Sequence, residues 1–528
     1  MPIKKIFQKK FIIFLIVFLV FYIKGLIFID PDFGWRIRAG EYYWKNGIPG
    51  TDIFSYTMPN FPWVDHAWGI SLAFYLVNIF LGYPVLVFFM SLLVLFIVFV
   101  LSIYIRKYNF GNLKDGHKPY FVGSKHINDR LFEFVFNNKF SLSLFPFILI
   151  ISLFLPFFGV RAQIFSWFMF STLIYWLSSE EIYTKVKVFL PVFFLLWANL
   201  HGSFALGLFI LFFYLALKSY KQRKIFSKDI LIGLISFSIV FLNPYGGGVW
   251  REAWSSASDP KLRWSIAEWM PALTMFDLSM VFLICISIVL IWRYKRKFSI
   301  YELGLFSFLF VQAISSRRQL PFWAIFTFPL IVRGIFYFWN DLAKIKQGRT
   351  RFLKVYNVAL IISVFMFFYQ TLFSIRSSYS MSFAKFYPVN AVGYLKENLP
   401  DGEILSEYGW GGYLIWQLPQ KKVFIDGRMP SWRWSVDDNG DLASAFDTYN
   451  KMLEGDEDYN EIFDRFHISA VLTRRVYDSN KNPFYEKAEN FLKLFGWEEN
   501  DFDIVRTLEE NGWKKVYEDD IAAIYLKN

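Results

Sequence analysis

Two aspartates and two arginines follow the first apolar segment of the chain. In the stretch IFIDPDFGWRIRAGEYYW, Asp30 and Asp32 flank a proline, and Arg36 and Arg38 come after them. An arginine guanidinium binds a phosphate with two parallel hydrogen bonds and offsets its charge. A nearby carboxylate accepts a proton from a hydroxyl group. These residue types therefore suit the transfer of a group from a phosphate to a hydroxyl at a membrane surface.

Each of these residues also has a structural interpretation. Asp32 stands where it would cap a helix that begins at about Phe33, because aspartate is among the preferred N-cap residues. Asp30 has less structural reason to lie beside an apolar run, so it is favoured as the base, and both acids are kept as candidates. On that helix, Arg36 and Arg38 would reach a phosphate, or would hold an amphipathic helix at the depth of the lipid head groups.

Further polar residues stand at the ends of other apolar segments. They are Asp65 and His66 in WVDHAW, Arg161 in GVRAQ, His201 in WANLHGS, and Arg317 and Arg318 in SSRRQLPFW. Two adjacent arginines on the outer side oppose the usual excess of basic residues in the cytoplasm, so Arg317 and Arg318 are the strongest candidates for a phosphate clamp. Anchoring to lipid head groups is the alternative for each arginine. His66 and His201 could ligate a metal ion, but no HxxxH or HExxH spacing supports this.

The composition identifies the kind of protein that must position these residues. The chain has 528 residues, is 55% hydrophobic and contains 65 phenylalanines, and apolar runs near the length of a bilayer crossing recur along it. The net charge of +12 fits basic cytoplasmic loops better than nucleic acid binding, because no basic run alternates with stacking aromatics. Cys285 is the single cysteine and lies in an apolar run, which excludes an internal disulfide and a cysteine metal cluster.

Basic segments predict how the chain crosses the membrane. The N-terminal lysines and the basic segments near 106–139, 218–228, 293–297 and 344–354 should share the cytoplasmic side. The apolar segment 68–84 must then lie on the outer surface or re-enter, because a crossing there would move 106–139 outside. We therefore predict a mostly α-helical polytopic bundle with the N-terminus inside and the C-terminus outside. It has about eleven spans, near 11–26, 85–105, 142–158, 164–177, 188–198, 204–217, 230–242, 279–292, 303–314, 321–338 and 356–373.

The segment after residue 376 has a different composition, in which acidic residues outnumber basic ones. Short apolar runs in it, KVFIDGR, HISAVLT and DIAAIYL, alternate with helical patterns, which predicts a small extracytoplasmic α/β domain. The predicted domains are therefore 1–376 in the membrane and 377–528 outside it. The motifs EYGWGGYLIW and FIDGRMPSWRW are attributed to packing, with acceptor or sugar contacts by Trp410, Asp426 or Arg428 as the alternative.

The layout resembles the GT-C type polytopic membrane glycosyltransferases, the superfamily of dolichyl-phosphate-mannose protein mannosyltransferases and aminoarabinose transferases. Those proteins carry an acidic motif after the first span, in an outer loop with surface-lying helices. IDPDFGWRIRAGEYYWKNGIPGTDIFSYT followed by WVDHAWGISLAFYLVNIFLGYP looks like that loop. The KPPL form of related enzymes is absent, and VDHAW stands in its place. The resemblance covers 1–373 in architecture and only the first loop in motif.

The resemblance implies an enzyme of the cell membrane that moves a sugar from a polyprenyl-phosphate-linked donor to an acceptor hydroxyl on a glycan, lipid or protein. Asp30 or Asp32 would be the catalytic carboxylate. The residues that we predict to bind substrate are Arg36, Arg38, Asp65, His66, Arg161, His201, Arg317 and Arg318. A divalent cation occurs in part of the superfamily, so the need for a cofactor is left open.

Three other functions are compatible with a polytopic chain. A polymerase or ligase of lipid-linked glycans usually relies on a large middle outer loop, whereas here the middle loop 243–276 is modest. A lipid or sugar transporter places charges near the bilayer midplane and often has paired halves, whereas here the charges stand at segment ends. A catalytically inactive scaffold with a recruiting tail is the third alternative.

Overall fold

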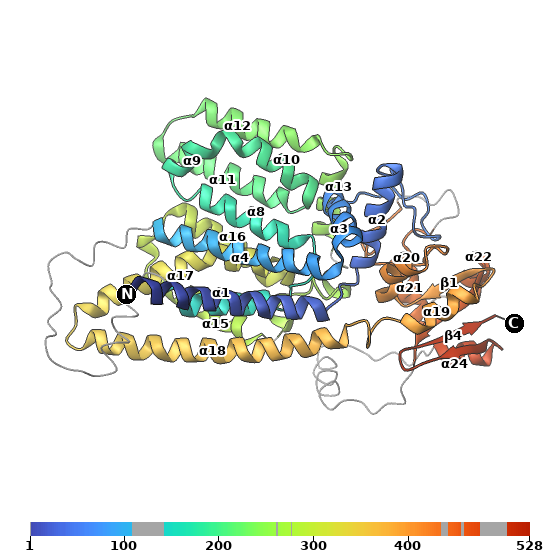
Figure 1. The fold of residues 1–528 in the computed structure, drawn as a ribbon. Helices are drawn as coiled ribbons and strands as arrows, with labels where there is room; N and C mark the ends of the chain where they lie inside the picture. The colour runs from blue at the N-terminus through green and yellow to red at the C-terminus, as the bar shows by residue number, and fades with distance from the viewer. Residues whose placement is uncertain are drawn as a thin grey trace. The chain divides into compact units, whose positions relative to one another are not determined.

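The computed structural model describes residues 2–107, 142–259, 262–275, 277–434, 442–455, 459–475 and 504–527. The chain divides into two compact units (Figure 1). Unit 1 comprises Met1–Phe28, Asp65–Ile70 and Val77–Ser378, and unit 2 comprises Ile29–Val64, Ser71–Leu76 and Tyr379–Asn528. The segment that carries Asp30 and Asp32 therefore folds together with the tail.

Unit 1 is a bundle of apolar helices. Each of the eleven segments that we predicted as spans contains a helix: α1 (Pro2–Ile27), α4 (Tyr83–Lys107), α7 (Leu144–Phe154), α8 (Gln163–Trp176), α10 (Leu190–Leu200), α11 (Phe204–Gln222), α12 (Ser227–Ser238), α15 (Leu278–Arg293), α16 (Ile300–Ser315), α17 (Leu320–Ala343) and α18 (Gly348–Ser380). Within the described residues, four helical stretches are long and apolar enough to cross a bilayer by length and composition: Tyr83–Ile105, Phe204–Gln222, Arg317–Ala343 and Thr350–Ser380. The number of spans and their orientation stay predictions.

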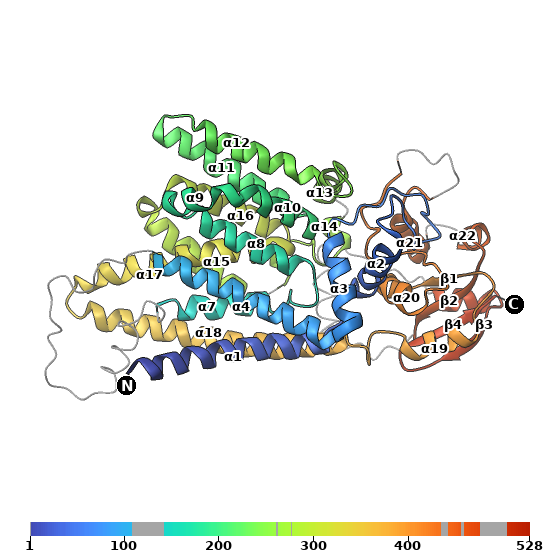
Figure 2. The same cartoon turned by 45° about the horizontal axis from the view of Figure 1, so that its top comes forward.

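Helix α17 lies at the centre of the bundle. The most apolar 18-residue stretch of this helix is 94% buried. The helix packs against α4, α7, α8, α15 and α16 (Figure 2). The most apolar 18-residue stretch of α18 is only 17% buried, as expected for a helix whose apolar surface faces lipid. The shorter elements of unit 1 are α9 (Glu180–Val186), η1 (Lys187–Phe189), η2 (Ile239–Phe241), α13 (Gly248–Ser258), α14 (Leu262–Ser265), η3 (Ala272–Met275), η4 (Lys295–Lys297) and η5 (Arg317–Gln319).

The apolar segment 68–84 forms the helix α3 (Trp68–Leu81) and the start of α4. Helix α3 has 14 residues, fewer than the roughly 20 that a helical crossing needs. Gly82 ends it with a φ of +82°, and α4 begins at Tyr83. The predicted spans α7, α8, α10 and α12 are no longer than α3, so the prediction that the segment does not cross the membrane stays a prediction.

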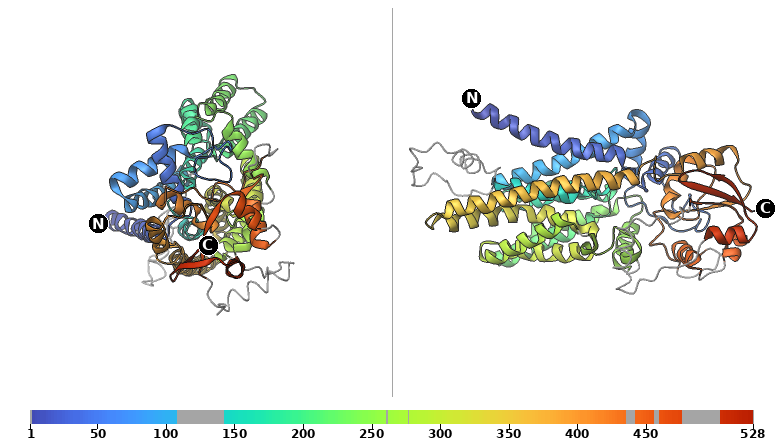
Figure 3. Two further views of the ribbon diagram at one scale, coloured as in Figure 1. Left: turned by 90° about the vertical axis from the view of Figure 1, so that its right-hand side faces the viewer. Right: turned by 90° about the horizontal axis from the view of Figure 1, so that it is seen from below.

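Unit 2 contains a four-stranded sheet with the order β1-β2-β4-β3. The strands are β1 (Glu403–Ser406), β2 (Ile468–Arg474), β3 (Lys514–Glu518) and β4 (Ala522–Leu526). Strands β1 and β2 are parallel, and the other pairs, including β3 and β4 in red in Figure 3, are antiparallel. The helices of this unit are α2 (Phe33–Asn46), α19 (Val389–Glu397), η6 (Tyr408–Trp410), α20 (Gly411–Gln417), α21 (Ala445–Glu454), α22 (Tyr459–Arg465) and α24 (Ile504–Glu510).

Two of the three apolar runs of the tail form strands, since HISAVLT lies in β2 and DIAAIYL contains β4. The expectation of a strand in KVFIDGR is wrong, because Val423 makes only one isolated bridge, to Ser55. Its amide donates to the Phe54 carbonyl at 3.0 Å, and its carbonyl accepts from the Tyr56 amide at 3.2 Å. The first loop thus takes the hydrogen bonds that a neighbouring strand would have taken.

Helices α2 and α20 approach so closely that only glycine fits between them. A Cβ atom at Gly34 would lie 2.2 Å from the carbonyl oxygen of Gly412, and one at Gly412 would lie 2.3 Å from the carbonyl oxygen of Pro31. Nearby, the Phe33 and Trp416 rings pack edge to face with centroids 5.5 Å apart. This close packing fixes the start of α2, and with it the position of the neighbouring acids.

We expect Gly34→Ala to destabilise the protein by about 1–3 kcal/mol, the usual cost of overpacking. The obstacle is a backbone carbonyl, which cannot rotate away as a side chain can. Gly393→Ala is the matched control, because a Cβ atom there meets nothing within 4 Å and alanine favours a helix. Thermal unfolding of the detergent-solubilised chain measures both. Equal melting temperatures for the two variants would contradict the packing described for α2 and α20.

Candidate active site

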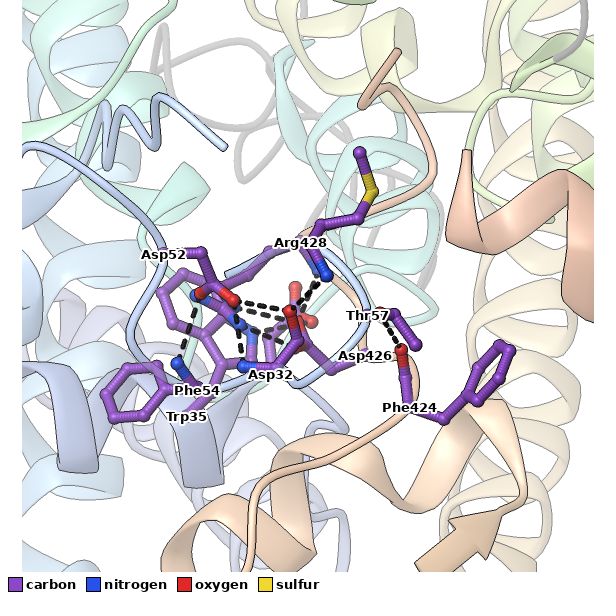
Figure 4. Close-up of polar contacts among 10 residues, drawn as sticks. Asp32, Trp35, Asp52, Phe54, Thr57, Phe424, Asp426 and Arg428 are labelled. Carbon is purple, nitrogen blue, oxygen red and sulfur yellow. Dashed lines mark hydrogen bonds and ion pairs between the residues drawn. The ribbon is translucent and has the colours of Figure 1, made fainter. Parts of the chain in front are cut away.

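The two aspartates at the start of α2 have different environments. Asp30 is 4% exposed, and its Oδ1 accepts a hydrogen bond from the Asp32 amide at 2.9 Å. Asp32 occupies the N-cap position, but its side chain does not cap the helix. Its Oδ1 instead accepts from the Trp35 indole Nε1–H at 3.0 Å (Figure 4). Asp32 is therefore the N-cap residue of a helix that begins at Phe33, as predicted, but its side chain makes no capping bond. The hydrogen bond that Asp30 accepts from the Asp32 amide gives Asp30 a structural role that the sequence did not reveal.

Asp32 is the more available of the two carboxylates. It is half-buried, whereas Asp30 is almost fully enclosed. Its Oδ2 makes no hydrogen bond within the described ranges. A carboxylate that is held through one oxygen and presents the other can accept a proton from a bound hydroxyl.

The two arginines of α2 differ in the same way. Arg36 is 8% exposed, its guanidinium lies 4.3 Å from the centre of the Trp35 ring, and it donates to Ser71 Oγ at 3.3 Å. The Arg38 side chain is 33% exposed and pairs with Glu41, which also pairs with Lys45. A partly exposed pair of this kind contributes little to stability, so Arg38 is the arginine of α2 that can exchange its partner for a phosphate at low cost.

A buried ion cluster joins the first loop to the tail. The Arg428 guanidinium donates to both oxygens of Asp426, at 2.8 and 2.6 Å, and to Asp52 Oδ1 at 2.6 Å (Figure 4). All three side chains are at most 2% exposed. The guanidinium is surrounded by the rings of Trp63, Phe54, Trp432 and Trp35, at 4.6, 5.0, 5.2 and 6.0 Å.

Burial dominates the electrostatics of this cluster. It raises the pKa of Asp426 above the ordinary value, although Arg428 opposes the change. Burial alone would lower the pKa of Arg428, but Asp426 and Asp52 outweigh it and raise that pKa above its usual range. The sequence attributed the tail motifs EYGWGGYLIW and FIDGRMPSWRW to packing, with acceptor or sugar contacts by Trp410, Asp426 or Arg428 as the alternative. Instead Asp426 and Arg428 bind each other, and the buried Trp410 donates to the Phe386 carbonyl at 2.8 Å.

In unit 1, three of the predicted arginines gather around the segment 268–274. Arg161 forms an ion pair with Glu268. The Arg318 guanidinium lies 5.2 Å from the centre of the Trp269 ring, and Arg317 Nε donates to Thr274 Oγ1 at 3.2 Å. The backbone of this pair is fixed as well, since the Arg317 and Arg318 amides donate to the Met270 and Glu268 carbonyls at 2.9 and 3.0 Å. We call this set (Arg161, Arg317 and Arg318) the basic rim.

The two predicted histidines also meet in unit 1. The His66 and His201 rings pack edge to face with centroids 5.4 Å apart. His201 Nδ1 contacts Ser166 Oγ at 2.9 Å, and Ser166 Oγ accepts from the Trp197 indole at 2.9 Å. Ser166 and Trp197 gave no signal in the sequence, because a serine and a tryptophan inside an apolar helix are ordinary.

The segment before α3 is tied down by its own side chains. Asp65 is 2% exposed, and its Oδ1 accepts from the Ala67 amide at 2.9 Å. Trp68 Nε1 donates to Asn199 Oδ1 at 2.9 Å. Among the residues that the structure describes, no three His, Cys, Asp or Glu side chains are grouped as metal ligands.

The predicted site residues thus fall into two sets. Unit 2 holds Asp30, Asp32, Arg36 and Arg38, and unit 1 holds Asp65, His66, Arg161, His201, Arg317 and Arg318. Within unit 1 the structure brings the two histidines together and gathers the three arginines around one segment. Within unit 2, Asp30 and Arg36 are buried, whereas Asp32 and Arg38 are half-buried.

No family model and no curated protein matches the sequence. The fold is similar to that of solved structures of the archaeal oligosaccharyltransferase AglB from Archaeoglobus fulgidus. One of these, a complex with an inhibitory peptide and a dolichol-phosphate, aligns with a TM-score of 0.58 and 10% identity, over 89% of this chain and 70% of that one. The apo form aligns with a TM-score of 0.55 and 11% identity, over 88% and 69% of the two chains.

A third structure, a complex with zinc and sulfate, aligns with a TM-score of 0.50 and 11% identity, over 87% of this chain and 67% of the other. At such identities the likeness lies in the fold alone. The fold is similar to that of this oligosaccharyltransferase, which confirms the resemblance in architecture that the sequence layout indicated over 1–373.

Proposed function

We propose that this chain is an integral membrane glycosyltransferase. It moves a sugar or glycan from a polyprenyl-phosphate-linked donor to an acceptor hydroxyl, on a peptide, glycan or lipid. The observation that carries the proposal is the fold, which is similar to that of an oligosaccharyltransferase whose structure contains a dolichol-phosphate and a peptide. The half-buried Asp32 and the basic rim supply the residue types that such a transfer needs.

The proposed chemistry assigns each group one task. Asp32 Oδ2 accepts the proton of the acceptor hydroxyl as the oxygen attacks the anomeric carbon. The bond from that carbon to the phosphate oxygen breaks, and the lipid phosphate leaves with the electron pair. The basic rim and Arg38 stabilise the negative charge of the departing phosphate, and Asp30 holds the turn that carries Asp32. Asp65, His66, His201 and Arg36 are the other proposed substrate-binding residues.

The predicted topology completes the proposal. With the N-terminus inside and the C-terminus outside, the first loop and the tail 377–528 lie on the outer face of a cell membrane. A polyprenyl tail then stays in the hydrocarbon while its sugar faces outward.

A transfer assay tests the proposal directly. The purified chain in lipid nanodiscs is incubated with radiolabelled sugars on polyprenyl monophosphate or polyprenyl diphosphate, together with peptide, glycan and lipid acceptors. We expect label to move to one acceptor class from one donor class. Failure of every donor to transfer label above a protein-free control would refute the assignment.

Replacing Arg318 with alanine is expected to weaken donor binding by about 10- to 150-fold, the value of a hydrogen bond to a charged group. Arg318→Lys should recover part of this loss through charge but not through planar stacking on Trp269. Arg293→Ala is the control, because this exposed arginine pairs with Asp341 at 3.7 Å, away from the rim segment. Donor titrations give the KM values. A KM for Arg318→Ala equal to that of Arg293→Ala would remove Arg318 from the donor site.

A further inference from the structure

The tail contacts the candidate base through a glycine. A Cβ atom at Gly427 would lie 2.2 Å from Asp32 Oδ1 and 3.9 Å from Trp35 Nε1. The backbone of this turn therefore lies directly against the carboxylate oxygen that accepts the Trp35 hydrogen bond (Figure 4). No other residue type fits here while Asp32 keeps its position.

The turn that carries Gly427 is held rigidly. Its neighbours Asp426 and Arg428 are linked twice. The Arg428 guanidinium donates to Asp426 Oδ2, and the Arg428 amide donates to Asp426 Oδ1 at 2.9 Å. Arg428 also binds Asp52 of the first loop. Buried and fully paired networks of this kind fix one conformation of the groups around them.

Trp35 is fixed from the other side. Its ring packs edge to face against Trp63 with centroids 6.3 Å apart, and the guanidinium groups of Arg36 and Arg428 lie 4.3 and 6.0 Å from its centre. The indole N–H is therefore aimed at Asp32 by packing, which is how enzymes orient a reacting group.

We propose that the Gly427–Arg428 turn of the tail is a positioning element for the Asp32 carboxylate. The turn contacts Oδ1 on one side and Trp35 donates to Oδ1 on another, so that Oδ2 faces the acceptor. The turn thus acts on the transfer step through Asp32. This inference rests on the proposed function.

Gly427→Ala tests the proposal with little risk to folding. The φ of Gly427 lies outside the left-handed region, and the atom that a new Cβ would meet is the end of a flexible side chain. We expect the Asp32 carboxylate to turn away. Because misplacing a reacting group slows the chemical step, kcat should fall by about 10- to 100-fold. Donor KM and melting temperature should be unchanged. Gly393→Ala, with open space around its Cβ atom, should transfer like wild type.

The same substitution in the Asp32→Asn background separates positioning from general damage. If Gly427 acts through Asp32, the second substitution adds no further loss, because the two effects are coupled. An equal loss in both backgrounds, or full kcat for Gly427→Ala, overturns the proposal. An inactive wild type, in contrast, refutes the proposed function itself.

Trp35→Phe provides a second variant if Gly427→Ala does not fold. It removes the indole donor to Asp32 Oδ1 and keeps an aromatic ring beside Trp63. We expect kcat to fall in the wild-type background and not to fall further in the Asp32→Asn background. Full transfer by a folded Trp35→Phe variant contradicts the positioning role.

Discussion

Replacing Asp32 with asparagine is expected to reduce kcat by 10²- to 10⁴-fold, the usual contribution of a positioned general base. The asparagine Oδ1 can still accept from the Trp35 indole, as the aspartate does at 3.0 Å, so the fold should be retained. The amide has no basic oxygen to take the acceptor proton. Initial rates at saturating donor and acceptor, together with a melting temperature within a few degrees of wild type, measure this.

Asp30→Asn is the matched control for that experiment. Asp30 supplies an acceptor for the Asp32 amide at 2.9 Å, and an asparagine oxygen supplies the same acceptor. We therefore expect the loss in kcat to be about tenfold or less, since the base itself remains. A larger loss for Asp30→Asn than for Asp32→Asn would reverse the two roles.

Replacing Arg428 with methionine is expected to destabilise the protein by about 3–5 kcal/mol, the cost of leaving buried charges without their partner. Asp426 and Asp52, both fully buried, would lose the guanidinium that binds them. Because one carboxylate comes from the tail and the other from the first loop, we also expect the loop to become sensitive to protease. Thermal unfolding and limited proteolysis of the solubilised chain measure both effects.

Arg474→Met is the control for the Arg428 variant. Arg474 pairs with Glu407 at 3.8 Å and is 55% exposed, so its loss should change stability by less than about 1 kcal/mol. Replacing Asp52, Asp426 and Arg428 together with apolar residues should recover much of the stability, because the ions are then no longer buried unpaired. Similar melting temperatures for Arg428→Met and Arg474→Met would show that the cluster does not join the loop to the tail.

The helices of unit 1 were the most predictable part of the fold. Long apolar runs such as 85–105 and 321–338 leave little choice, because a segment without water must satisfy its backbone internally. The strand in KVFIDGR was predicted wrongly because a strand, unlike a helix, needs a hydrogen-bonding partner outside its own segment. Its short apolar run is typical of a buried strand, but its hydrogen-bonding partner is the first loop. A local pattern carries no information about a partner far along the chain.

The association of the first loop with the tail could not be predicted. Asp52 and Arg428 are separated by 376 positions, and nothing near either residue indicates the other. The same holds for Ser166 beside His201, which are 35 positions apart. In contrast, Asp30, Asp32 and the basic rim were identified because charged residues at the ends of apolar segments are costly and usually functional.

The order of the two acids needed the structure as well. From the sequence, Asp32 was a candidate helix cap and Asp30 the favoured base. The contact between Asp30 Oδ1 and the Asp32 amide, together with the Trp35 hydrogen bond to Asp32, supports the reverse assignment. Side-chain hydrogen bonds of this local kind compete with capping, and their outcome depends on packing.

Release of the lipid phosphate tests the proposed chemistry most directly. The full chain in proteoliposomes is given a donor with one radiolabel in the sugar and a second in the polyprenyl phosphate, together with the acceptor found in the transfer assay. We predict that the sugar label moves to the acceptor, that an equal amount of free polyprenyl phosphate appears, and that Asp32→Asn produces neither. Intact donor that has only moved across the bilayer, or equal lipid phosphate release by wild type and Asp32→Asn, would contradict a glycosyltransferase that uses Asp32 as its base.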